Sequence, residues 1–300
     1  MKWRRGQGRN SDVIDARAGG LGGRGGLGPR VALPGGVGIV GVILFLAFQV
    51  LSGGGGGSGG GLGVENPFGP SPQAPGAGAR GIPAAQDPER DLKEFSSYVF
   101  TNSLDTWETL FAEEGTRFER AKLVLYRDAV NTACGNASSA VGPFYCPGDE
   151  RVYLDLSFYG DMERELGAPG DFAWAYVIAH EVGHHVQQEL GTSDEVNRLR
   201  REQPDQANAL SVRLELQADC YSGVWAHSVF AAGDLEKGDV QEAIRASAAV
   251  GDDRLQSRGG GQVNPDSFTH GSSEQRTEWF NRGRESGEPA DCDTFSPEAV

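Results

Sequence analysis

Hydrophobic and polar positions divide the chain into an N-terminal part without a core pattern and a C-terminal part with a repeated helical pattern. From Asp91 onward, apolar residues recur three and four positions apart, which is the spacing of one face of an α-helix. We therefore expect a mainly helical folded body that begins near Asp91. The pattern predicts helices over residues 91–115, 172–190, 205–232, 238–250 and 272–287.

Two shorter stretches favour β-strands. Residues 121–126 (AKLVLY) and 151–156 (RVYLDL) are rich in residues that favour strands, and Gly and Pro between them favour a turn. We expect a small antiparallel sheet, which makes the fold class α+β. An exposed edge of such a sheet can bind an extended peptide, although an ordinary core sheet has the same sequence pattern.

The residues before the body predict three further segments. Residues 1–30 are Gly-rich and basic and predict a disordered tail. Residues 31–51 contain no charged residue, and these 21 positions are enough to cross a membrane as a helix. Residues 52–90 contain 13 Gly and 6 Pro and predict a flexible tether. The body then comprises residues 91–300.

The apolar segment at residues 31–51 predicts an uncleaved membrane anchor. Pro34-Gly35-Gly36 weakens its first turns, so a cleaved signal peptide is an alternative, but no clear A-x-A cleavage site is present. The positive-inside rule places the basic tail in the cytoplasm and the body outside it. We expect a single-pass protein of the cell membrane with an extracytoplasmic body.

Charge argues against one class of partner. Residues 1–30 contain seven basic and two acidic residues, a net charge of +5, so the remainder must carry −20 to give the whole-chain charge of −15. Nucleic acid would be repelled by so acidic a body.

The four cysteines form no CxxC pair that would indicate a structural zinc or a redox centre. In a body outside the cytoplasm they allow two disulfides. Cys134 and Cys146 are 12 residues apart and would close a small loop. Cys220 and Cys292 are then the remaining pair.

The strongest chemical signal is the HExxH motif at His180, Glu181 and His184, inside the predicted helix 172–190. Residues four apart lie on one helix face, so the two imidazoles can bind one metal ion. Glu181 can then take a proton from a metal-activated water. HExxH also occurs by chance, but a buried His-Glu-His cluster without a metal would carry a large desolvation cost. His185 points about 100° away from the ligand face and is expected at the surface or behind the ligands.

A catalytic zinc site usually has three protein ligands and one position open for water. Gln187 and Leu190 exclude the HExxHxxGxxH class, because Gly and His would be required there. Glu215 is our candidate for the third ligand. Asp219, one helical turn later, can hydrogen-bond a ligand histidine and hold its ring. Cys220 is an alternative thiolate ligand.

Three segments, HEVGHHVQ, ELQADCYSGVW and FTHGSSEQRTEWF, resemble the neutral zinc metallopeptidase family of bacteria (YpfJ-like), and so does the start SDVIDARAG. The resemblance covers nearly the whole chain apart from the tether. It implies a zincin-like fold and the HExxH…ExxxD pattern of gluzincins such as the HtpX and CAAX-protease type. By that pattern His180, His184 and Glu215 bind zinc, Glu181 is the base and Asp219 supports a ligand.

In that wider group a histidine in a TH-containing segment stabilises the oxyanion, and by motif this is His270. We expect His270 over the open side of the metal, in a loop whose geometry Glu274 and Arg276 could fix. A solvent-exposed loop histidine is the alternative.

These features predict a membrane-anchored zinc endopeptidase with Zn²⁺ as cofactor and a peptide or protein as substrate. A catalytically inactive metal-binding scaffold at the cell surface is the alternative from another class, and the intact Glu181 argues against it. An aminopeptidase or a zinc amidohydrolase also remains open.

Overall fold

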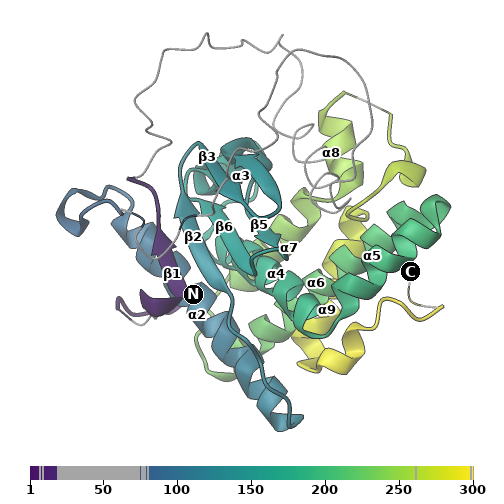
Figure 1. Ribbon diagram of the computed structural model, residues 1–300, viewed down its shortest axis with the longest axis horizontal. Helices are drawn as coiled ribbons and strands as arrows, with labels where there is room; N and C mark the ends of the chain where they lie inside the picture. The colour runs from purple at the N-terminus through teal and green to yellow at the C-terminus, as the bar shows by residue number, and fades with distance from the viewer. Residues whose placement is uncertain are drawn as a thin grey trace, which may run out of the picture.

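The computed structural model describes residues 1–6, 8, 10–18, 75, 79, 81–260, 262–297 and 299. Helices dominate these residues, and a small sheet lies beside them (Figure 1). The expected α+β class with mainly helical content is confirmed. The helices are α2 (Arg90–Glu113), α3 (Phe158–Arg164), α4 (Asp171–Glu189), α5 (Thr192–Glu202), α6 (Ala207–Ala231), α7 (Asp239–Ala249), α8 (Asp252–Arg258) and α9 (Ser273–Ser286).

The main sheet is mixed rather than antiparallel, so the predicted pairing of its two long strands is wrong. Its order is β1-β2-β6-β5, and β2 pairs with β6 in parallel. The chain between β2 and β6 first forms a separate hairpin of β3 and β4 and then β5, which pairs with β6 in antiparallel. The strands are β1 (Val13–Asp15), β2 (Lys122–Tyr126), β3 (Ala129–Thr132), β4 (Gly135–Ser138), β5 (Phe144–Cys146) and β6 (Arg151–Asp155).

The described N-terminal residues are part of the folded body, so the predicted disorder of the tail is wrong for the described residues up to 18. Strand β1 pairs in parallel with β2, with Val13 opposite Leu123. The Trp3 ring lies 5.4 Å from that of Phe95 on α2. Arg17 is buried and forms an ion pair of 2.5 Å with the buried Asp87. Residues 19–30 are rich in glycine, so the composition of the whole tail gave no indication of this short strand.

Among the residues that the structure describes, no helix is both long and apolar enough to cross a membrane. The predicted span at residues 31–51 lies outside the described residues, as does most of the predicted tether. The tether's last part is described and leads into α2, which begins at Arg90.

Helix α4 lies in the core, between other helices and the sheet. Its buried residues include Phe172, Trp174 and Tyr176, and it packs against α2, α6 and α7. Helices α6 and α9 approach each other closely, because a Cβ on Gly223 of α6 would lie only 2.1 Å from the carbonyl oxygen of Phe280 on α9. This approach brings polar residues of α9 to the buried face of α6.

Two disulfides link separate parts of the body. Cys134, between β3 and β4, is joined to Cys146 at the end of β5. Cys220 on α6 is joined to Cys292 in the C-terminal segment. These are the two pairs expected from the sequence. The second bridge rules out Cys220 as a free thiolate ligand in this structure.

Candidate metal centre

Helix α4 presents His180 and His184 on one face, one turn apart. Their ring centroids are 4.8 Å apart and the ring planes are nearly perpendicular, at 86°. His180 is buried, and both side chains line one cavity together with Glu181. The helix ends at Glu189, and Gly191, two residues later, has a φ of +76°, which favours glycine.

Glu215 reaches the two imidazoles from α6. Its Oε2 atom lies 3.3 Å from Nε2 of His180, and its Oε1 atom lies 3.5 Å from Nε2 of His184. Zinc bonds to nitrogen and oxygen are about 2.0–2.2 Å long, so tetrahedral ligand atoms are about 3.4 Å apart. The three residues offer ligand atoms that all lie within 4.8 Å of one another. This donor set fits a zinc ion.

The electrostatics of this group favour a cation. Burial alone would lower the pKa of His180, but Asp219 and then Glu215 raise it to about 9. Burial alone would raise the pKa of the Glu215 carboxyl, but His184 and His180 hold it well below its ordinary value. The site therefore keeps a buried carboxylate charged and stabilises positive charge beside it.

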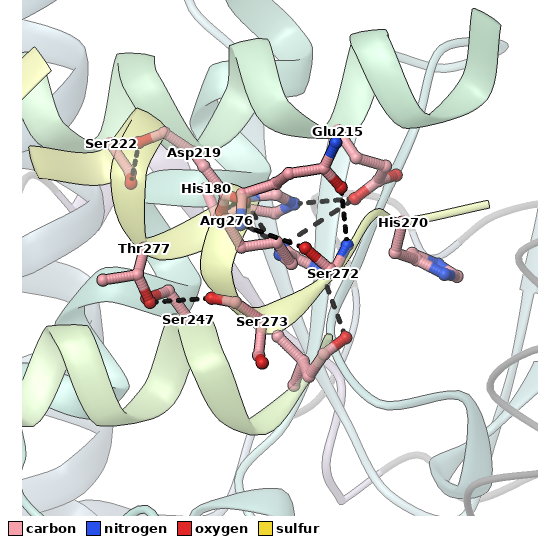
Figure 2. A network of polar contacts seen from close by, with 12 residues as sticks. His180, Glu215, Asp219, Ser222, Ser247, His270, Ser272, Ser273, Arg276 and Thr277 are labelled. Atoms are coloured by element: carbon pink, nitrogen blue, oxygen red, sulfur yellow. Dashed lines mark hydrogen bonds and ion pairs between the residues drawn. The ribbon is translucent and has the colours of Figure 1, made fainter. Parts of the chain in front are cut away.

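Asp219 holds the ring of His180 in place. Its Oδ1 atom lies 2.9 Å from Nδ1 of His180, which leaves Nε2 to face the metal position. Arg276 of α9 donates to both oxygens of Asp219, at 2.8 and 3.0 Å. The Tyr176 hydroxyl also donates to Asp219. Figure 2 shows Arg276 reaching from α9 toward Asp219 and Glu215 on α6.

Gln187 contacts His184 as Asp219 contacts His180, but with an amide oxygen instead of a carboxylate oxygen. Its Oε1 atom lies 2.9 Å from Nδ1 of His184. The Gln187 side chain is fully buried, and its amide nitrogen donates to the Leu214 carbonyl oxygen at 2.6 Å and to Oε1 of Gln217 at 3.1 Å. This contact was not predicted from the sequence, where the spacing of three residues between His184 and Gln187 was the available signal.

Glu181 lies in the same cavity, next to the imidazoles. Burial raises the pKa of its carboxyl, and His184, His180 and, less strongly, the backbone N–H of Tyr145 on β5 partly offset this rise. A carboxylate with a raised pKa is a better proton acceptor at neutral pH. His185 is buried rather than at the surface, and it contacts Tyr145 and the Glu119 carbonyl oxygen instead of the ligand group. His185 thereby links α4 to β5 and to the segment before β2.

His270 also lines this cavity and is buried, with 8% of its surface exposed, so it is not a solvent-exposed loop residue. Asp252 at the start of α8 holds it. One Asp252 oxygen accepts the backbone N–H groups of Thr269 and His270, both at 2.7 Å, and the other lies 3.2 Å from Nδ1 of His270. The Nε2 atom is then the ring nitrogen left for the cavity.

Asp252 was missed in the sequence, where the GDDR segment reads as an ordinary helix start. The expected support from Glu274 and Arg276 is not what holds the loop, because Arg276 is bound to Asp219. Asp253, the neighbour of Asp252, accepts instead from Ser273 at the start of α9.

Comparisons with known proteins agree with a zinc site. Residues 1–295 match the family model described as "Putative neutral zinc metallopeptidase". A protein of Escherichia coli strain K12, named "Uncharacterized protein YpfJ", is 46% identical over 297 residues, which are 98% of this chain and 99% of that protein. "Uncharacterized protein Rv2575" of Mycobacterium tuberculosis H37Rv is 44% identical over 208 residues, 65% of this chain and 68% of that protein. No solved structure matches the chain significantly.

Proposed function

Because the chain belongs to the neutral zinc metallopeptidase family, we propose that it is a zinc-dependent endopeptidase. The observation that carries the proposal is the meeting of His180, His184 and Glu215 in one buried group beside Glu181. In this arrangement the first three residues hold Zn²⁺. A bound zinc ion lowers the pKa of a water and polarises a carbonyl group.

Each remaining group has a role in the hydrolysis of an amide. Glu181 accepts the proton of the attacking water and returns it to the nitrogen of the leaving product. His270 donates a hydrogen bond to the carbonyl oxygen while negative charge develops there. Asp219, Gln187 and Asp252 fix the three imidazole rings, so no ring has to reorient during the reaction.

Strand β5 supports a peptide as the substrate. It is the last strand in the described order of the main sheet, and its Phe144 and Tyr145 line the cavity of the candidate centre. An extended peptide added to this edge would run past Glu181, which accepts the N–H of Tyr145. This placement favours cleavage within a peptide chain.

We also propose that the folded body lies outside the cytoplasm, attached to the membrane through the apolar segment at residues 31–51. The two disulfides support a location outside the cytoplasm, because disulfides persist in oxidising environments. The 21 uncharged residues of the segment support the attachment.

The replacement Glu181→Gln tests the endopeptidase function. It removes the proton acceptor but none of the three ligand groups. We expect one equivalent of zinc to remain bound and hydrolysis of a casein-type substrate to fall by at least about 10². Zinc content and initial rates measure the two effects.

The matched control is Glu189→Gln on the same helix, because Glu189 accepts the backbone N–H of Glu119 and does not line the cavity. It should keep both zinc and activity. Undiminished hydrolysis by the Glu181→Gln protein would reject the base assignment. A zinc-loaded parent that is inert on a broad peptide library would favour a metal-binding scaffold instead.

A further inference from the structure

The cavity over the metal-ligand group extends well beyond the residues that the chemistry needs. It has a volume of about 190 Å³. An apolar cavity of about 150 Å³ is large enough to hold a benzene ring. The cavity therefore has room for a bulky side chain next to the reacting groups.

One part of its lining is apolar and comes from several elements. Val177 lies on α4, one turn before Glu181, so it shares the face of the motif. The described lining residues that carry charge belong to the candidate centre, and the lining arginine, Arg276, is bound to Asp219. The residues of this apolar part are Val141, Phe158, Leu166, Val177, Val250 and Leu255, while Leu214, Pro143 and Pro147 line the cavity elsewhere outside the strands.

This apolar part lies next to His270. Val250 and Leu255 flank Asp252 in sequence, and Asp252 holds His270. Leu166, which lines this part of the cavity, is held by Arg258 of α8. Arg258 donates to the carbonyl oxygens of Glu165 and Leu166 at 3.1 and 2.8 Å. A substrate side chain bound in this part of the cavity would thus place a carbonyl oxygen close to His270. This oxygen belongs to the same substrate residue or to its neighbour.

We propose that this apolar part of the cavity is a specificity subsite that selects a large aliphatic or aromatic side chain beside the cleaved bond. The proposal rests on the endopeptidase function and names its substrate class, peptides with a Leu-, Met- or Phe-like residue at one fixed position next to the cleaved bond. A charged side chain is rejected, because no described charged group outside the candidate centre lines the cavity to pair with it. A small side chain leaves the space unfilled and gains little.

Binding to the zinc-loaded Glu181→Gln protein tests the subsite without turnover. The probes are amino-acid hydroxamates whose side chain is methyl, isobutyl, benzyl or carboxymethyl, and calorimetry measures their Kd. We expect the isobutyl and benzyl compounds to bind at least about tenfold more tightly than the methyl compound. The carboxymethyl compound should bind no better than the methyl one. Equal affinities across the series would overturn the subsite.

The additional replacement Val177→Phe fills the space from the wall next to Glu181. It should remove the preference for the benzyl compound by at least about tenfold, while zinc content and affinity for the methyl compound stay within about threefold of the parent. Val263→Phe is the matched control, because Val263 is 40% exposed and does not line the cavity. A preference that survives Val177→Phe would overturn the assignment.

Cleavage by the wild-type protein separates this inference from the proposed function. On an unbiased peptide library, we expect large apolar residues to be enriched at one position beside the cleaved bonds. Cleavage without such enrichment would overturn the subsite and leave the endopeptidase function standing. Absence of cleavage by zinc-loaded protein, with the hydroxamate preference intact, would overturn the endopeptidase function and support a specific apolar binding site.

Discussion

At the scale of single residues, the two ligand histidines have different hydrogen-bond partners. His180 is held by the charged Asp219, while His184 is held by the neutral amide of Gln187. A carboxylate partner makes an imidazole a stronger ligand than an amide partner does. The amide therefore limits the negative charge of the site while it still fixes the ring.

We predict that Gln187→Met lowers zinc affinity by about 10- to 100-fold, because the Nδ1 group of His184 loses its acceptor. Gln187→Glu keeps an acceptor and should bind zinc at least as tightly as the parent. Competition with a chelator of known affinity measures both. Gln188→Met is the control at the neighbouring position on α4. An unchanged affinity in Gln187→Met would show that the contact does not position His184.

The contact between His270 and Asp252 predicts a pH dependence. Burial alone would lower the pKa of His270, but Asp252 and then Glu215 raise it above 6.5. The Nδ1 atom lies 3.0 Å from the Thr269 hydroxyl oxygen and 3.2 Å from Asp252. When Nδ1 donates its proton to Asp252, Nε2 carries a proton only when the ring is charged. Activity should therefore be lost as the pH rises through this raised pKa.

We predict that Asp252→Asn lowers the pKa of His270, so the alkaline limb of the kcat/KM profile moves to lower pH. The rate at its maximum should also fall. Asp253→Asn is the control, because Asp253 binds Ser273 rather than His270. An alkaline limb at the same pH in the Asp252→Asn protein would mean that another group controls it.

At the scale of elements, helices were easier to predict than strand directions. Helices α4 and α6 follow from apolar spacing, and Gly191 marks the end of α4. The parallel pairing of β2 with β6 depends on the path of the chain between them, through the β3–β4 hairpin and β5, which no local pattern specifies. Likewise, Asp252 meets His270 across 18 residues because of how α8 packs, so the spacing alone carries no signal.

The two disulfides should differ in how much they stabilise these elements. The bridge from Cys220 to Cys292 spans 72 residues, and that from Cys134 to Cys146 spans 12. If a bridge acts by restricting the unfolded chain, its loss costs about 4 kcal/mol for the long loop and about 3 kcal/mol for the short one. Denaturant unfolding of the Cys→Ser double variants measures the two losses. A larger loss for the short loop would contradict this account.

At the scale of the whole molecule, the N-terminal residues and the helical body form one folded unit. Arg17 donates to Asp15, Asp87 and Glu89, which lie on both sides of residues 19–80. A Cβ on Gly81 would lie 2.8 Å from the Asp15 carboxylate. The described residues before and after this stretch therefore meet at one place, and breaking this buried ion network by Arg17→Ala would cost about 3–5 kcal/mol.

The packing of the N-terminal residues bears on the proposed membrane attachment. A single crossing at residues 31–51, with the tail inside, would place β1 and β2 on opposite faces of the bilayer, although they pair in parallel. The charge pattern and the packing therefore predict different positions for residues 1–18. If residues 1–18 lie in the cytoplasm, the contacts of Trp3, Val13 and Arg17 with the body are all absent. If residues 1–18 lie on the side of the body, these contacts are all present.

We predict that residues 1–18 lie on the same side as the body, because a buried ion pair and a paired strand attach them to it. The proposed attachment through residues 31–51 would then not be a single crossing. Arg5 and Glu285 are exposed, so Arg5→Cys and Glu285→Cys report on the tail and on the body. The four native cysteines are in disulfides and give no background. A maleimide that does not cross membranes should label both variants equally in intact cells. Labelling of Arg5→Cys only after permeabilisation would place the tail in the cytoplasm, and the β1–β2 pairing would then be absent from the anchored protein.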